Sequence, residues 1–221
     1  MAGSFAPEMF PKPTILPLGD SALLVRFGAS LTDAANRAAI ALAARLDDAP
    51  IPGLVEVMPN LISVLLRYDP LVTSPADLQG ELRLRLFGLT EAGREARRWS
   101  ISVVFDGPDL AQTAAALGLT SEAFIIAHNA APLRVLATGF APGFVYCGLH
   151  EGLFLPRRTS VRPAVPAGSV LFAAGQTAIT ATDMPTGWHV IGRTSFSNFV
   201  PQDEPPTRLN AGDIIAFESA P

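Results

Sequence analysis

TGFAPGFVYCGL at residues 138–149, LPRRTSVRPAVPAGSVLFAAGQTAI at 155–179 and MPTGWHVIGRT at 184–194 are the segments around which this sequence is organised. They concentrate Gly, Pro, aromatic and Arg residues in a way that burial of apolar strands alone does not require. Glycine tolerates positive φ and proline fixes φ, so the first segment predicts a rigid loop whose backbone approaches another group closely. The loop residues that we single out are Gly139, Phe140, Pro142, Gly143 and Phe144.

The region around these segments predicts a β-barrel. Beyond Leu133, short apolar strands alternate with turns that carry Pro or Gly at almost every junction. This pattern is typical of a closed or nearly closed barrel. A strand is expected upstream at 99–105, followed by two helices at 109–117 and 121–129, which begin at the capping residues Asp109 and Ser121.

The first part of the chain has a different pattern. Residues 1–13 contain three prolines and no periodicity, which predicts a flexible leader. Residues 14–92 predict strand, strand, helix, strand, strand, helix, with Thr32 and Ser74 as helix caps. We therefore expect a two-layer α+β sandwich resembling a ferredoxin-like fold. The polar stretch at 90–98 is the expected linker to a second domain at 99–221.

Composition argues against several classes of function. The chain has 221 residues, 49% of them apolar, a net charge of −4 and no basic run, so a nucleic-acid partner is not expected. Lys12 is the single lysine, which argues against a P-loop and against Schiff-base chemistry. The single Cys147, best explained as a buried small hydrophobe, and three histidines without helical i, i+4 spacing predict no metal site. With no apolar run of about 18–20 residues, we expect a cytoplasmic protein without a membrane span.

Three arginines, Arg157, Arg158 and Arg162, form the strongest electrostatic feature of the sequence. The planar guanidinium group matches carboxylate and phosphate oxygens, so this cluster is a candidate anion site. The alternative is a surface turn whose arginines pair with Asp and Glu.

Three further positions are candidates for chemistry. His128, near the end of a predicted helix, has a free pKa close to neutrality and is a candidate acid or base, or else a helix C-terminal cap. Gln176 and Thr177 follow Gly175, where an amide and exposed backbone could stabilise an oxyanion, or where a hairpin could satisfy its own backbone. Trp188 could line a pocket or fill the barrel.

The sequence resembles a known family in six segments. They are GFAPGFVY, LPRRTSVRPAVPAGSV, GQT at 175–177, GWHVIGRT, PLGDSALLVRFG near the start and LLRYDP at 65–70. The family is the B subunit of bacterial ATP-dependent 5-oxoprolinase, also described as allophanate hydrolase subunit 1 or kinase inhibitor KipI. It resembles one part of the carboxyltransferase region of urea carboxylases. One departure is Ala174, which stands where the family usually has Gly.

The resemblance implies a cyclophilin-like barrel in the second domain and hydrolysis of 5-oxo-L-proline to L-glutamate with ATP. It implies two partners of the 5-oxoprolinase type, a C-like subunit (allophanate hydrolase subunit 2 or KipA-like) and an A-like subunit. The chain has no Walker motif, so ATP would be bound unconventionally or shared with a partner. Two alternatives remain open: a KipI-like inhibitor of a histidine kinase, and an allophanate hydrolase or urea carboxylase part.

Together with the residue patterns, the resemblance assigns candidate roles. The catalytic candidates are His128, Gln176 and Arg158. The substrate-binding candidates are Arg157, Arg162, Gly139, Phe140, Pro142, Gly143, Phe144, Thr177, Trp188 and Arg193.

Overall fold

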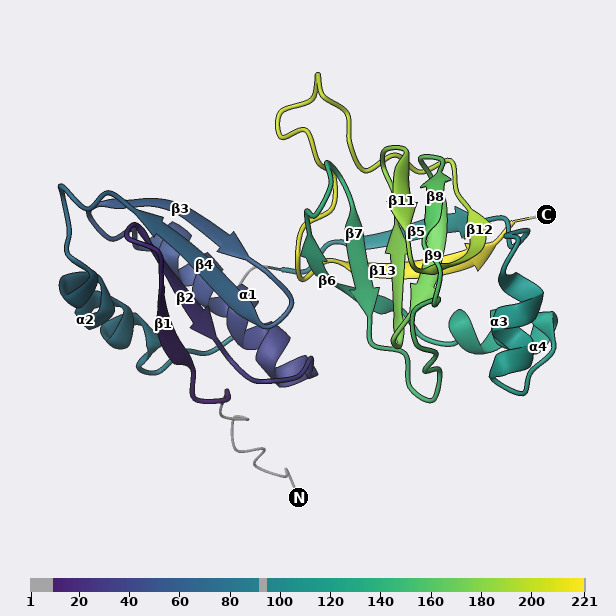
Figure 1. Cartoon of the computed structure of the whole chain (residues 1–221), viewed down its shortest axis with the longest axis horizontal. Helices are drawn as coiled ribbons and strands as arrows, with labels where there is room; N and C mark the ends of the chain where they lie inside the picture. The colour runs from purple at the N-terminus through teal and green to yellow at the C-terminus, as the bar shows by residue number, and fades with distance from the viewer. Residues whose placement is uncertain (1–9, 92–94, 221) are drawn as a thin grey trace. The chain divides into compact units, whose positions relative to one another are not determined.

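Two strand pairs, each followed by a helix, form the first of two compact units in the computed structural model, which describes residues 10–91 and 95–220 (Figure 1). The boundary between the units falls after Glu95. The elements of the first unit are β1 Thr14–Leu18, β2 Ala22–Arg26, α1 Asp33–Asp48, β3 Leu54–Pro59, β4 Ser63–Tyr68 and α2 Pro75–Leu86. Residues 1–9 of the predicted leader and 92–94 of the predicted linker lie outside the described residues.

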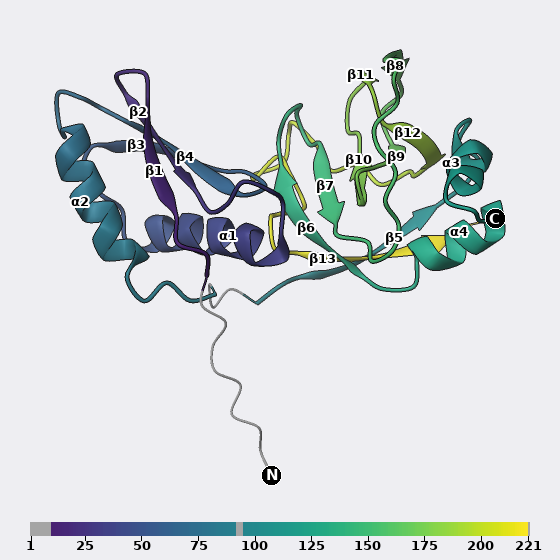
Figure 2. The ribbon, with the colours of Figure 1, turned by 60° about the horizontal axis from the view of Figure 1, so that its bottom comes forward.

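Helix capping and strand alternation explain the first unit. Thr32 and Ser74 accept hydrogen bonds from the backbone N–H groups of Ala35 and Asp77, as expected of N-caps. Alternate apolar residues of β2 and β4 point to one face of the sheet and are buried with one side of each helix. Figure 2 shows α1 lying along this face. The fully buried members of this core include Leu23, Val25, Leu42, Val64, Leu66, Leu78 and Leu82.

The expected ferredoxin-like arrangement of this unit is not confirmed. The strand order is β1-β2-β4-β3 and each neighbouring pair is antiparallel. The elements follow one another as ββαββα, whereas a ferredoxin-like unit runs βαββαβ. Layers and element types were therefore predictable from the local pattern, but the pairing of the strands was not.

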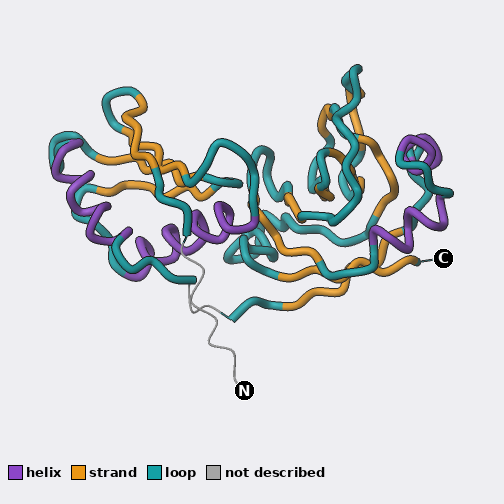
Figure 3. The backbone as a smooth tube through the Cα atoms, turned by 90° about the horizontal axis from the view of Figure 1, so that it is seen from below, coloured by secondary structure: helices purple, strands orange, loops and turns teal. Residues whose placement is uncertain are grey.

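The second unit is built on a curled sheet. Its elements are β5 Arg98–Val103, α3 Leu110–Ala116, α4 Ser121–His128, β6 Leu133–Thr138, β7 Val145–Gly148, β8 Arg162–Val165, β9 Ser169–Ala173, β10 Gln176–Ile179, β11 Met184–Thr186, β12 His189–Arg193 and β13 Ile214–Ser219. The sheet order is β12-β9-β10-β7-β6-β13-β5, and β8 pairs with β11 as a separate ribbon. Figure 3 shows this curved run of strands, with α3 and α4 next to each other.

The two edge strands of the curled sheet meet. Val104, just after β5, and Arg193 of β12 exchange two backbone hydrogen bonds of 2.9 Å. The sheet thereby curls into a barrel, which is consistent with the expected cyclophilin-like fold. Closure removes exposed strand edges, which would otherwise be open to pairing with another chain.

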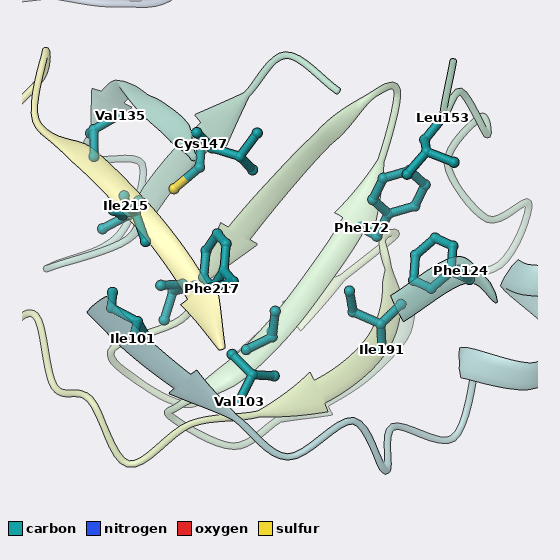
Figure 4. Packing of buried hydrophobic residues seen from close by; sticks show 14 of the residues in the cluster. Ile101, Val103, Phe124, Val135, Cys147, Leu153, Phe172, Ile191, Ile215 and Phe217 are labelled. Carbon is teal, nitrogen blue, oxygen red and sulfur yellow. The ribbon is translucent and has the colours of Figure 1, made fainter. Parts of the chain in front are cut away.

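Alternation along the strands divides the curled sheet into two faces. The inner face carries residues such as Cys147, Phe172 and Ile179, which belong to the larger buried core of this unit. Figure 4 shows Cys147, Phe172, Ile191 and Phe217 pointing from different strands into this common interior. The outer face carries residues such as Tyr146, Leu171 and Ala178, which pack in a second cluster with Val165 and Met184 of the β8–β11 ribbon.

The two helices of this unit start where predicted, but their caps differ from the prediction. Asp109 stands at the N-cap of α3, yet its side chain makes no capping hydrogen bond. The cap of α4 is Thr120 rather than Ser121, and its hydroxyl accepts from the N–H of Ala123. Among the described helices, no single one is long and apolar enough to cross a membrane; α3 and α4 reach that length and composition only when taken together, across a bend of 84°.

We expect Gly107→Ala to destabilise the barrel by about 2 kcal/mol, because added volume in a closely packed site forces the backbone to move. A Cβ at Gly107 would lie 2.3 Å from the carbonyl oxygen of Val190 and 2.5 Å from the amide nitrogen of Gly192. The matched control is Gly187→Ala, because a Cβ at Gly187 meets no atom within 4 Å. Urea unfolding of both variants checks this, and equal stabilities would show that residues 104–109 do not pack closely against β12.

Candidate functional site

Thr177 is the centre of a buried polar cluster on the inner face of the barrel. Its hydroxyl oxygen lies 2.8 Å from Nε2 of His128 and 2.8 Å from Nε2 of His150. On its other side, His128 Nδ1 lies 2.7 Å from Oδ1 of Asn129. The two imidazole rings pack against each other with centroids 4.7 Å apart. The cluster therefore connects α4, β10 and the loop after β7 through side chains only.

Burial keeps both histidines of this cluster neutral. Desolvation lowers the pKa of His128 to about 4, and the contact with Asn129 offsets only part of this effect. Desolvation, followed by the proximity of His128, lowers the pKa of His150 to about 3. Cys147, opposite Thr177 on β7, is fully buried, which raises the pKa of its thiol far above the usual range. Its predicted role as a small hydrophobe is confirmed.

Arg158 and Arg162 converge on Asp109. Their guanidinium nitrogens lie 2.5 and 2.8 Å from Oδ1 of Asp109, whose Oδ2 accepts from the N–H of Val190 at 2.8 Å. Burial would raise the pKa of Asp109, but the Val190 hydrogen bond and the guanidinium groups of Arg162 and Arg158 outweigh it and hold the pKa below its usual value. This geometry favours the alternative interpretation of these two arginines, in which they pair with an acid.

Arg157, the third arginine, lies apart from this ion pair. Its guanidinium carbon is 5.6 Å from the ring centre of Trp188, and it forms no ion pair within residues 95–220. Trp188 is buried and packs against Tyr146 and, through it, Phe144. Burial raises the pKa of the Tyr146 hydroxyl despite the opposing charge of Arg157. Arg157 is therefore the member of the arginine cluster that remains available to an external anion.

Gln176 and Thr177 point to opposite faces of the sheet, although they are adjacent in sequence. Successive strand residues point to opposite faces, so Gln176 lies on the outer face with Ala178, while Thr177 lies on the inner face with Ile179. The Gln176 side chain is 7% exposed, and its Oε1 has no hydrogen-bond partner among the described residues. A buried amide oxygen without a partner is costly to the folded chain.

The predicted rigid loop at 139–144 has the expected backbone. Gly139, Phe140 and Gly143 all have positive φ, and the Phe140 side chain is 80% exposed. At Gly143 the close approach is to the chain itself, because a Cβ there would lie 2.5 Å from the Cβ of Phe199. Pro142 lies in the tight turn of this loop. Phe140 remains as its exposed apolar residue.

Two positions from the sequence analysis remain: Arg193, a predicted substrate-binding residue, and Ala174, which stands where the family usually has Gly. The Arg193 side chain forms an exposed ion pair with Asp106 at 2.8 Å, on the strand whose backbone closes the barrel. Ala174 has a φ of +51° in the turn between β9 and β10, a conformation for which glycine is better suited. Neither residue contacts the Thr177 cluster in the interactions described.

Sequence reasoning missed His150, Asn129, Asp109 and Tyr146. His150 gave no signal beyond its residue type, because its contact with Thr177 spans 27 residues through strand pairing. Asp109 was interpreted as a helix cap, and its bonds to Arg158 and Arg162 span 49 and 53 residues. Tyr146 could have been predicted to face away from the core, because it precedes the core residue Cys147 on β7, and on that face it packs against Trp188.

The first unit contains a pocket of about 1110 Å³ between its N-terminal strand and the two helices. Its lining is largely apolar and includes Phe10, Phe27 and Phe87, with Arg37 and Arg83 at its polar side. None of the predicted site residues lies in this unit, so the candidate chemistry is confined to the second unit.

The arrangement of an α+β unit followed by a curled barrel is shared with proteins of known structure. The chain belongs to the family described as carboxyltransferase domain, subdomain C and D, whose model matches residues 13–209. It is 36% identical over 215 residues to the 5-oxoprolinase B subunit of Bacillus subtilis (strain 168), covering 90% of each chain. It is also 36% identical over 210 residues to the 5-oxoprolinase B subunit of Escherichia coli O157:H7, covering 90% of this chain and 93% of that relative.

A solved structure supports the same assignment. The crystal structure of TTHA0988 matches with a TM-score of 0.80 and 40% identity over 90% of this chain. This chain spans 40% of the TTHA0988 chain.

Proposed function

We propose that this chain is the B subunit of an ATP-dependent 5-oxoprolinase complex, which hydrolyses 5-oxo-L-proline to L-glutamate. The observation that carries the proposal is its 36% identity to the 5-oxoprolinase B subunit of Bacillus subtilis over 90% of both chains. The proposed partners are the C-like and A-like subunits of the same enzyme, because the naming of the relatives implies an assembly of several subunits.

The described side chains suit a small anionic lactam. 5-Oxoproline offers a carboxylate, a lactam carbonyl and a lactam N–H. The exposed guanidinium of Arg157 suits the carboxylate or a phosphate. The side-chain amide of Gln176 is proposed to orient the lactam, and its oxygen, which is buried in this structure, would have to turn outward to do so. Arg158 and Arg162 act through Asp109 in this proposal, by fixing the segment that carries Arg157.

The residues of this chain do not fit a conventional nucleotide site. Its single lysine, Lys12, precedes β1, and no Walker motif is present. We therefore assign most of the ATP contacts to the partners. ATP would supply a phosphoryl group to the lactam oxygen, which makes the ring carbon open to attack by water.

Co-expression with the C-like and A-like partners tests the proposal. The assembled complex should release glutamate from 5-oxoproline only when ATP and this chain are both present. A stable complex without glutamate release would refute the proposal and favour kinase inhibition or urea-linked carboxyl transfer.

Arg157→Ala should lower kcat/KM of the assembled complex for 5-oxoproline about 30-fold, equivalent to about 2 kcal/mol for a lost charge-assisted hydrogen bond. Arg157→Lys should retain part of the activity, because the charge stays but the planar fork is lost. Arg98→Ala, which removes another exposed arginine of the same unit, is the control and should stay close to wild type. Equal losses in Arg157→Ala and Arg98→Ala would exclude a specific role for Arg157.

A further inference from the structure

Hydrogen-bond donors and acceptors in the Thr177 cluster can be assigned one by one, starting from Asn129. The side-chain nitrogen of Asn129 lies 3.3 Å from the hydroxyl of Ser219, and its Oδ1 faces His128 at 2.7 Å. An amide oxygen only accepts hydrogen bonds. His128 therefore carries its proton on Nδ1 and donates it to Asn129.

The next assignment follows from the neutral state of His128. A neutral imidazole has one donor and one acceptor nitrogen, so Nε2 of His128 accepts the hydroxyl proton of Thr177. A hydroxyl has one proton, which is now used. Thr177 must therefore accept at its oxygen from His150, and His150 carries its proton on Nε2.

The remaining nitrogen of His150 is left as an acceptor. Its Nδ1 has no hydrogen-bond partner among the described residues, and it is not one of the fully buried polar atoms. The ring is held in place by contact with His128 and by Phe172 at a centroid distance of 5.6 Å. The His150 backbone N–H donates to the carbonyl of Gly175 at 2.9 Å, which fixes the loop beside β10. The cluster thus holds one acceptor nitrogen in a fixed direction.

We propose that His150 presents Nδ1 as a hydrogen-bond acceptor to a ligand at the partly exposed end of the Thr177 cluster, and that Thr177, His128 and Asn129 are positioning residues that fix its tautomer. The donor is the O–H of the attacking water or the N–H of the lactam. This assignment rests on the proposed function for its ligand. It makes His150 the residue that contacts the ligand. His128, which sequence reasoning favoured, is 1% exposed and acts on His150 only through Thr177.

Orientation of a histidine by a chain of side chains is a recurring device in hydrolytic enzymes. There, a third group fixes which ring nitrogen carries the proton and thereby sets the direction of the basic nitrogen. In this chain the hydroxyl of Thr177 is the group that fixes the proton on His150. The hydroxyl's own proton points to His128. Loss of the hydroxyl removes the acceptor and frees His150 to change tautomer.

The tautomers can be measured on this chain alone. Long-range ¹H–¹⁵N spectra of the ¹⁵N-histidine-labelled protein at neutral pH should show His150 protonated on Nε2 and His128 on Nδ1. Thr177→Val should give mixed tautomers at His150, whereas Thr177→Ser should keep the wild-type pattern. His150 protonated on Nδ1 in the wild-type protein would overturn the proposal, whether or not the valine variant folds.

Kinetics of the assembled complex identify the donor. Thr177→Val should lower kcat/KM for 5-oxoproline about tenfold or more, and Thr177→Ser should restore most of it. A higher KM with little change in kcat identifies the lactam N–H, and a lower kcat with little change in KM identifies the attacking water. An active wild-type complex with unchanged kcat and KM in Thr177→Val would overturn the proposal. An inactive wild-type complex would instead refute the proposed function together with its ligand, while the spectra would still decide the tautomers.

Discussion

Asp109→Ala should lower the free energy of unfolding of this chain by about 3–5 kcal/mol, the cost typical of removing one partner from a buried ion pair. The Asp109 side chain is 5% exposed and accepts from Arg158, Arg162 and the N–H of Val190. Its removal leaves two partly buried guanidinium groups and one buried N–H without this acceptor. It also removes the two side-chain contacts that hold Arg158 and Arg162 to Asp109, so the segment at 156–162, which carries Arg157, should be held less firmly against β12.

The matched control is Asp106→Ala, three residues earlier in the same loop. Asp106 pairs with Arg193 at a similar distance of 2.8 Å, but both side chains are about half exposed or more. Exposed pairs contribute about 0–1 kcal/mol because water screens them. Urea unfolding of the two variants should therefore separate them by at least about 2 kcal/mol. A loss below about 1 kcal/mol in Asp109→Ala would show that Arg158 and Arg162 find other partners.

Local sequence signals predicted the elements of this fold well. Thr32 and Ser74 cap helices through short-range bonds that depend only on neighbouring residues. The order of strands in the first unit was not accessible in this way, because β2 pairs with β4 across a helix and a further strand. Such long-range pairing is set by packing of the whole unit.

The candidate site was predictable in its residue types but not in its grouping. Arg157, Arg158 and Arg162 are close in sequence, yet two of them are bound to Asp109 and one lies on Trp188. Gln176 and Thr177 are adjacent, and the strand period of two separates them to opposite faces. That separation could have been expected once 176–179 was assigned as a strand. The contact of Thr177 with His128 and His150 required the tertiary structure.

Lowering the pH from 7 to 5 should reduce the free energy of unfolding by about 4 kcal/mol because of the two buried histidines. The pKa of His128 is lowered to about 4 and that of His150 to about 3, whereas a free histidine has a pKa of about 6.5. Below pH 6.5 the unfolded chain therefore binds protons that the folded chain does not bind. The unfolded state gains stability as the pH falls, and this continues until the folded pKa values are reached.

The double variant His128→Gln/His150→Gln provides the control for this pH dependence. It is expected to be less stable at pH 7 but to show a much flatter profile down to pH 5, because no buried imidazole remains in the Thr177 cluster. Asp109 does not contribute in this window, since its pKa is lowered and it stays ionised in the folded chain. Cys147, across the strand from Thr177, stays neutral because burial raises its pKa. Urea unfolding of the wild-type chain and the double variant at several pH values is the measurement. A flat wild-type profile between pH 7 and 5 would mean that the folded cluster takes up protons. That outcome is incompatible with a neutral His128, on which the tautomer assignment of His150 depends.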